Sequence, residues 1–393
     1  MAETTGPLWS DIPLDLAGKI LRHLPAHVDR LRFAAVCPQW RAAARQCPRP
    51  PPMPMLLLPD ATVYCLPGSK PFQFPDCAGY TDACGNWLVF SCDHGCFLMD
   101  PFSNATVTIP ALSCDRIRYV GDPAVDEAYI ESMEMDALMV EPISCKLVFC
   151  SPHLVAAIVL LWGATRIAVC QPGATWWSVS ADSQCPDFVD MAFHQGKLYA
   201  LTGVDTLFAI DVSMDHNTGH PWVSQMLQVI NNPPLFIPGP DPLTILKMTY
   251  LVEARGALLV VLRKMQCQYA AGATGLAAFE AVAGEQNEFE VFEANFVQSQ
   301  WTKVTVLGDD QILFVRRRCS RSVCVSHDEV PGNSIFFLEN EDEDRLWSKV
   351  ASSSCSVYNM KDGKVSTPLP TVSWKRGRGL HNTPFATWLF PQN

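Results

Sequence analysis

One hairpin pattern recurs along most of this chain. Each copy consists of a short apolar run, a turn and a second short apolar run. Six copies lie at 63–74, 97–109, 168–179, 207–223, 289–304 and 356–365. Several copies follow another apolar run that begins at a turn residue, as at 85–90, 195–200, 256–261 and 308–313. Short apolar runs bounded by turn residues predict a chain built from many short β-strands.

Repetition of one hairpin predicts a β-propeller, in which units of three or four antiparallel strands are arranged around a ring. The spacing is uneven, with 71 residues from Asp100 to Gln171 and 40 from Gln171 to Asp211, so we expect about six blades with insertions of different length. Two stacked β-sandwiches would also alternate strands and turns, but they do not require a hairpin that recurs with an aromatic residue in one place. Segments 56–58 and 387–390 are predicted to share a blade and close the ring, which leaves no open sheet edge.

Composition supports a folded chain and limits its partners. Hydrophobic residues make up 48% of the sequence, enough for a large core. The formal charge is 29 − 40 = −11, which argues against a general nucleic-acid binder. The 16 cysteines mostly lie in apolar runs, as expected for small buried side chains in a reducing compartment. The longest apolar run, 154–162, is about half the length of a membrane helix. We therefore expect a protein of the cytoplasm, the nucleus or both, with no membrane association.

The first 47 residues differ from the rest because their apolar spacing is helical. Leu16, Ile20, Leu21 and Leu24 share one face of a predicted helix that Pro25 ends. A second helix is predicted from 29, to be ended or kinked at 38, and a short third helix at 41–45, with the arginines turned mostly outward. So few residues cannot enclose a dry core of their own. The surplus apolar surface must be covered by the rest of this chain or by another protein.

A proline-rich segment separates the two parts. Residues 48–54 hold five prolines in seven positions, which favours a stiff extended spacer. A docking site for a proline-binding module is the alternative. The boundary gives a helical domain at 8–47, a linker at 48–54 and a strand-rich domain at 55–393.

Loops and basic clusters are interpreted as solvated surface. Segments 122–141, 269–284 and 339–344 interrupt the strand pattern and are predicted to be connections. The clusters at 316–318 with Arg321, and at 375–376 with Arg378, are interpreted as solvated strand ends or local contacts for acidic loops. A role in nuclear import or nucleic-acid binding is the alternative.

Motifs for chemistry are not found. The sequence has no phosphate-binding loop, no C-x-x-C, no H-E-x-x-H and no G-x-S-x-G. The best metal candidate combines Cys92, His94 and Cys96 with Cys84, but we interpret it as a hairpin turn beside small buried cysteines. We therefore expect no metal, no cofactor and no catalytic residue. Carboxylate pairs of the kind that hydrolyse glycosidic bonds stay open, because sequence spacing does not reveal their separation.

The N-terminal helices resemble an F-box. The resemblance rests on the segments 9–16, 20–21, 24–25, 36–37 and 40–41, which run from a hydrophobic-Pro start to a "V-C-x-x-W" signature. Two positions depart from the pattern. Ile12 replaces the commoner Leu before Pro13, and Pro38 stands where a basic residue is usual.

The rest of the chain resembles plant F-box proteins that carry a C-terminal KIB-type propeller, similar to kelch propellers. The carrying segments are 86–88, 99–106, 192–201, 250–253, 289–294, 357–360 and 388–391. The resemblance implies a non-catalytic substrate receptor of an SCF-type (Skp-cullin-F-box) ubiquitin ligase. The F-box would bind a Skp-type adaptor, and through it a cullin, while the propeller would bind an unidentified protein substrate.

The resemblance also implies which residues contact the adaptor. These are Ile12, Pro13, Leu16, Ile20, Leu21, Leu24, Val36, Cys37 and Trp40, some of which must instead form the small core of the F-box. Two alternatives from other classes stay open. The chain could be a propeller enzyme of the glycoside hydrolase or lactonase class, or a binding module that acts without any ligase.

Overall fold

The fold was obtained as a computed structural model. It describes residues 12–24, 26–46, 52–66, 70–92, 95–120, 143–161, 163–180, 185–216, 218–231, 235, 244–269, 279–281, 287–325, 330–338, 350–369, 372–375 and 386–391. The expected loops at 122–141 and 339–344, most of 269–284 and the basic residues at 376 and 378 lie outside the described residues. So do residues 48–51 of the spacer.

Three short helices open the described chain. They are α1 (Leu14–Arg22), α2 (His27–Val36) and α3 (Pro38–Gln46). Cys37 is extended between α2 and α3 and ends the second helix, so Pro38 begins the third helix, where its missing N–H costs nothing. Trp40 therefore lies on α3 and packs its ring against Phe33 of α2 at 4.5 Å.

The helices enclose a small core of their own, contrary to expectation. It consists of Ala17, Leu21, Phe33, Ala43 and Ala44, all buried. The small alanine side chains let the three helices approach closely enough for one leucine and one phenylalanine to fill the space between them. A core can therefore form from fewer residues than the composition suggested.

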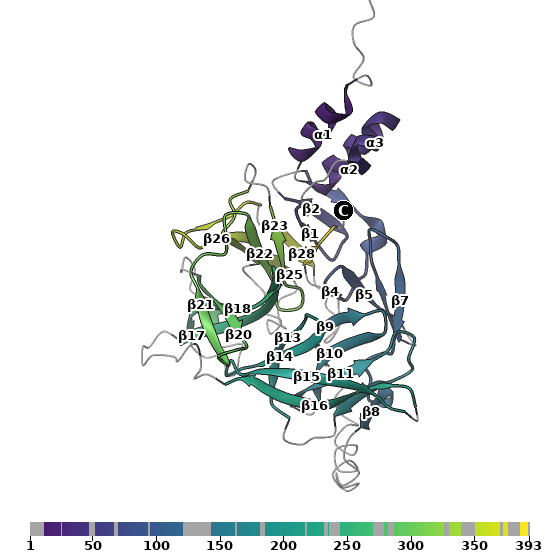
Figure 1. Cartoon of the computed structure of the whole chain (residues 1–393), viewed down its shortest axis with the longest axis vertical. Helices are drawn as coiled ribbons and strands as arrows, with labels where there is room; N and C mark the ends of the chain where they lie inside the picture. The colour runs from purple at the N-terminus through teal and green to yellow at the C-terminus, as the bar shows by residue number, and fades with distance from the viewer. Residues whose placement is uncertain are drawn as a thin grey trace, which may run out of the picture.

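The remaining described strands form a six-bladed propeller, as predicted (Figure 1). The blades that follow the regular pattern, each with its strands in spatial order, are β29 (Thr387–Leu389), β1 (Met55–Leu57), β2 (Thr62–Cys65) and β3 (Phe72–Gln73); β4 (Asp82–Cys84), β5 (Trp87–Cys92), β6 (Gly95–Met99) and β7 (Thr106–Ile109); β13 (Phe188–His194), β14 (Lys197–Thr202), β15 (Leu207–Met214) and β16 (Pro221–Ile230); and β17 (Thr244–Ala254), β18 (Ala257–Tyr269), β20 (Glu288–Asn295) and β21 (Gln300–Val304).

Two blades have five strands, one pair of which is parallel. The third blade orders β8 (Ile117–Val120), β12 (Trp177–Ser180), β11 (Ala164–Cys170), β10 (Leu154–Leu161) and β9 (Ile143–Ser151), with β8 parallel to β12. The sixth orders β23 (Arg321–Cys324), β22 (Gln311–Val315), β24 (Ser334–Leu338), β26 (Cys355–Asn359) and β27 (Val365–Ser366), with β22 parallel to β24. Strand β19 (Phe279–Ala281) pairs with β18, and β25 (Val350–Ser353) with β28 (Val372–Lys375) forms a separate two-stranded sheet. The expectation of antiparallel units alone was wrong for these two blades.

The ring closes as predicted. Strand β29 near the C-terminus pairs antiparallel with β1, so that Met55 lies opposite Leu389 and Leu57 opposite Thr387. Both strands are buried. The first blade thus combines the two ends of the propeller, and its closure leaves no unpaired edge at the point where the repeats begin and end.

Tryptophan side chains link consecutive blades. The indole N–H of Trp177 donates to the carbonyl of Pro110 at 3.1 Å, and that of Trp301 donates to the carbonyl of Asp205 at 2.8 Å. Trp388 reaches the carbonyl of Val315 at 3.5 Å. Each bond joins a strand of one blade to the chain of the blade before it. The aromatic residue that recurs in the sequence pattern therefore has a structural role between blades.

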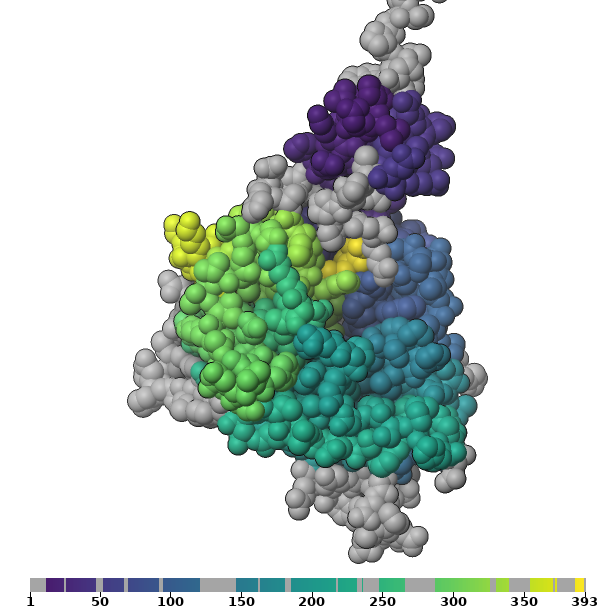
Figure 2. Space-filling view, viewed as in Figure 1, coloured from purple at the N-terminus to yellow at the C-terminus, as the bar shows by residue number. Residues whose placement is uncertain are grey.

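The helices contact the ring at one edge, beside β1 and β2 (Figures 1 and 2). Ala26 forms a parallel bridge with Met53 and is buried in the same cluster as Met55 and Leu57. The ring of His27, the first residue of α2, meets Phe102 of the second blade edge-on at 5.3 Å. These contacts mean that the helices are packed onto the propeller as well as connected to it.

Candidate functional site

Apolar side chains are exposed on the face of the helices that does not pack into their core. On α1, Leu16 is 45% exposed and Ile20 is 38% exposed, one helical turn apart. On α2, Leu31 and Val36 are each 56% exposed. Single exposed apolar residues are common, but several on two short adjoining helices are typical of a protein-docking surface.

The structure separates the predicted adaptor contacts into two groups. Pro13, Leu16, Ile20 and Val36 are exposed, whereas Leu21 has no exposed surface and fills the helical core. The half-buried members of the predicted set are Ile12, Leu24, Cys37 and Trp40, of which all but Cys37 pack against that core. Leu21 therefore cannot contact a partner while the helices stay folded.

Sequence reasoning missed Leu31. It lies on α2 between two buried residues, Arg30 and Phe33, and its exposure equals that of Val36. The helical period could have found it, because Phe33 and Arg30 are three residues apart on one side and Leu31 falls on another. Arg30 was expected to point outward. It is buried, and its guanidinium donates to the carbonyl of Leu24 at 2.6 Å.

Hydrogen bonds between the helical segments hold this face in place. The amide of Gln39 on α3 donates to the carbonyl of Ile12 at 3.0 Å, and Arg41 donates to the carbonyl of Ala34 at 3.2 Å. These bonds tie the start of α1 and the end of α2 to α3. The exposed apolar side chains are thus presented by a preformed surface, so a partner would not have to order it.

Buried charges in the propeller join blades. Asp190 on β13 is 1% exposed and forms an ion pair with Lys146 on β9, in the blade before it. The same carboxylate accepts the N–H of Leu251 on β17 at 2.6 Å and that of Met191 at 2.7 Å. Burial raises the pKa of Asp190, whereas Lys146 and the two N–H groups oppose that shift. The cluster fastens three consecutive blades, and its carboxylate is out of reach of a substrate.

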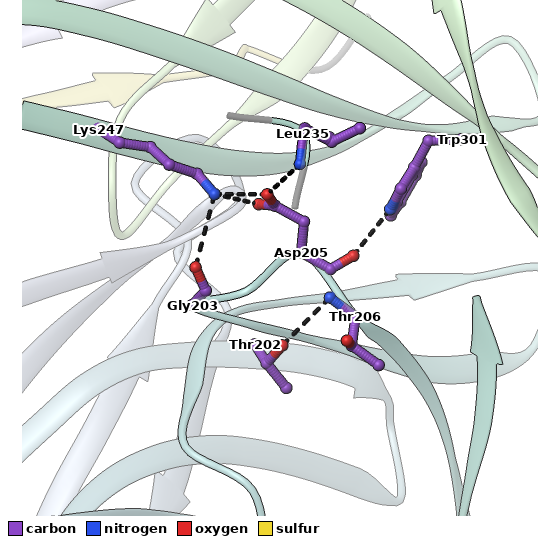
Figure 3. Close-up of polar contacts among 7 residues, drawn as sticks. All are labelled: Thr202, Gly203, Asp205, Thr206, Leu235, Lys247 and Trp301. Carbon is purple, nitrogen blue, oxygen red and sulfur yellow. Dashed lines mark hydrogen bonds and ion pairs between the residues drawn. The ribbon is translucent and has the colours of Figure 1, made fainter. Parts of the chain in front are cut away.

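A second buried carboxylate links the fourth and fifth blades (Figure 3). Asp205, in the turn between β14 and β15, receives Lys247 of β17 at 2.5 Å and the N–H of Leu235 at 2.9 Å. Its carbonyl accepts the indole N–H of Trp301, and the turn is closed by the N–H of Thr206 donating to the hydroxyl of Thr202. Every polar group of Asp205 drawn in Figure 3 is therefore used to hold blades together.

The basic cluster at 316–318 is largely not the solvated strand end that the sequence suggested. Arg316 is 6% exposed, and Arg318 pairs with Asp82 of β4 at 2.9 Å. Arg321 donates to the side chain of Asn86 at 2.8 Å. These arginines connect the sixth blade to the second across the short β29 strand. They are local contacts, as the sequence allowed, but with a buried strand rather than an acidic loop.

No metal site is found among the described residues, where no three His, Cys, Asp or Glu side chains converge. Cys84 is buried and desolvation raises its pKa well above the usual range, so its thiol is a poor ligand. Residues 93 and 94 of the candidate metal motif lie outside the described residues. Within the described part of the chain, no helix is long and apolar enough to span a membrane.

Comparison with known proteins gives the same two-part division. Residues 56–359 match the KIB1-4 beta-propeller family and residues 9–50 match the F-box domain. The chain is similar to F-box protein At2g26160 of Arabidopsis thaliana, at 23% identity over 85% of this chain and 96% of that protein. It is also similar to F-box only protein 7 of the same plant, at 20% identity over 92% of this chain and 90% of that protein. The chain therefore belongs to the KIB1-4 beta-propeller family and carries an F-box.

Proposed function

We propose that this protein is the substrate-recognition subunit of an SCF-type ubiquitin ligase. Its helices would bind a Skp-type adaptor, and its propeller would bind the protein to be ubiquitinated. The observation that carries the proposal is the exposed set Leu16, Ile20, Leu31 and Val36, presented by helices that are packed onto a propeller. An adaptor would bury this apolar surface, and the packed junction would fix where the propeller holds its substrate.

In this mechanism the chain catalyses nothing by itself. It raises the effective concentration of a substrate near a ubiquitin donor, because both are held by one assembly. The packing of Ala26 against Met53 and of His27 against Phe102 supports this role, since a loose connection would spread the substrate over a larger volume.

The most direct test is adaptor binding by the full chain. A Leu16→Ala and Ile20→Ala double variant removes side chains that are about half exposed, so each forfeits roughly 1 kcal/mol of burial against a partner. Together they are expected to weaken binding to a purified Skp-type adaptor about 30-fold. The matched control changes Val204 and Leu227, which are 59% and 50% exposed on the propeller, to alanine.

The control is expected to bind the adaptor as the unchanged chain does. If the helical double variant also keeps its affinity, or if the propeller control loses as much, the docking face has been placed wrongly. Circular dichroism should show both variants folded, because neither change touches the helical core or a buried strand.

The enzyme alternative receives no support from the described carboxylates. A hydrolase needs two carboxyl groups in an accessible site, whereas the buried groups Asp82, Asp190 and Asp205 each hold an ion pair between blades. The binding-module alternative is distinguished by lifetime. Under the proposal, a protein captured by the propeller persists longer when residues 1–47 are removed, and a simple binding module would leave its lifetime unchanged.

A further inference from the structure

Cys324 differs from the other cysteines whose burial the structure describes. It is the last residue of β23 in the sixth blade, and it is the exposed one among them. Seven others are buried and four are half-buried. Its neighbour in the sequence pattern, Cys319, is fully buried, and burial raises the pKa of that thiol to about 11. Exposure gives Cys324 the access that a reactive thiol requires.

The register of the sheet places an amide beside this thiol. Cys324 lies directly opposite Gln311 on β22, so the two side chains stand next to each other on one face of the sheet. Gln311 is 4% exposed, and its Nε2 is a buried donor without a hydrogen-bond partner. A buried donor that is left unpaired is costly, which marks the position as one that an acceptor could complete.

A guanidinium approaches the same thiol from the fifth blade. Gln311 and Leu313 share a face of β22, and Leu313 packs in one cluster with Tyr250 and Val252 of β17. At the end of β17, the guanidinium of Arg255 interacts with the Cys324 thiol and forms an ion pair with Asp310. The pKa of Arg255 is raised by these two neighbours, the thiol first. Arg255 thus divides its donors between a carboxylate and the sulfur.

This arrangement favours an anion at the sulfur. A thiolate, not a thiol, is the nucleophile, and cations and N–H donors beside it stabilise that form. Arg255 supplies the charge and Gln311 supplies an unused donor, while the Asp310 carboxylate opposes both by competing for Arg255.

We propose that Cys324 is an oxidisable thiol, held for reaction by Arg255 and Gln311, and that its co-reactant is a hydroperoxide. The thiolate attacks the outer oxygen of the peroxide, forming an S–O bond as the O–O bond breaks. The sulfur is oxidised by two electrons to a sulfenic acid, and hydrogen peroxide is reduced to water after the leaving hydroxide takes a proton. The Gln311 amide and Arg255 then donate to the new oxygen.

The test measures thiol reactivity site by site in the folded full chain. Pulses of iodoacetamide, and of hydrogen peroxide followed by a sulfenic-acid trap, are read by peptide mass spectrometry, with half-buried Cys114 as the internal reference. Cys324 is expected to react at least about tenfold faster than Cys114, as the loss or gain of one charge-assisted hydrogen bond implies.

Three variants make the expectation directional. Arg255→Asn keeps a residue that tolerates the positive φ of 52° and should slow Cys324 about tenfold. Gln311→Met should also slow it, without loss of stability, because it removes an unpaired buried donor. Asp310→Asn should speed it, because Arg255 loses its competing partner. A merely structural role would leave the rate ratio of Cys324 to Cys114 unchanged in all three. The proposal is overturned if Cys324 reacts no faster than Cys114, or if Asp310→Asn slows it.

Discussion

Lys146 and Asp190 form the most deeply buried ion pair with a described partner in each of two neighbouring blades, and its removal should be costly. Their side chains are 6% and 1% exposed. In a Lys146→Met variant the volume of the side chain is nearly kept, but a buried carboxylate loses its counter-charge. Removing one partner of such a pair typically costs about 3–5 kcal/mol. Because Asp190 retains the N–H groups of Leu251 and Met191, we expect about 3 kcal/mol.

The measurement is equilibrium urea unfolding followed by tryptophan fluorescence. The matched control is Lys303→Met, which makes the same change in an ion pair with Glu290 where the lysine is 55% exposed. Glu290 keeps Lys264 as a second partner, so the control should cost at most about 1 kcal/mol. Equal losses in the two variants would refute the reasoning that burial, rather than charge pairing, makes the Asp190 cluster important.

The same variant gives a pH prediction with a definite sign. Burial raises the pKa of Asp190 in the folded chain above its ordinary value, so the folded state binds more protons than the unfolded state within that interval. Stability therefore falls as the pH rises through the raised pKa. Loss of Lys146 removes the main group that opposes the shift. The stability gap between the variant and the unchanged chain should narrow from pH 8 to pH 5, and a gap that widens towards pH 5 would contradict this account.

Three further changes test the ring itself. Trp301→Phe removes the donor to the carbonyl of Asp205 and should cost about 1–3 kcal/mol in urea unfolding, whereas an unchanged midpoint would mean that the bond contributes nothing. A chain ending at residue 385 lacks β29 and should lose the single cooperative transition on heating, because β1 then presents an unpaired edge. Gly196→Ala, at a φ of +80°, should cost about 1 kcal/mol, and Gly203→Ala, whose added Cβ would make an ordinary 3.6 Å contact with Val189, serves as the neutral control.

Much of the propeller could be predicted from sequence because its elements are local. Strands joined by tight turns need only short apolar runs and residues that accept a positive φ, such as Asn104 and Gly363. Each of these heads the return of a six-residue turn, at 100–105 and 359–364, with the same backbone hydrogen bonds. The same pattern signalled the pairing of the chain ends, since both were short apolar runs without a partner in the repeat.

The extra strands could not be predicted in the same way. Strand β8 lies parallel to β12, and β22 lies parallel to β24, so neither belongs to a hairpin. Parallel neighbours are joined by longer connections that leave no local signal in the turn residues. The buried positions of Arg316 and Arg318 were hidden for a related reason, because their partner Asp82 lies more than two hundred residues away.

The helices show the same division within a single motif. Apolar spacing in the sequence determined which residues of α1 point to one side, and the resemblance to an F-box determined what that side is for. It did not decide that Leu21 would be enclosed while Leu16 and Ile20 stayed exposed. Hydrophobic periodicity reports only that a side chain avoids water, whereas its burial depends on which distant segments arrive to cover it. That depended on how closely Ala43 and Ala44 of α3 could approach, which is a property of packing in three dimensions.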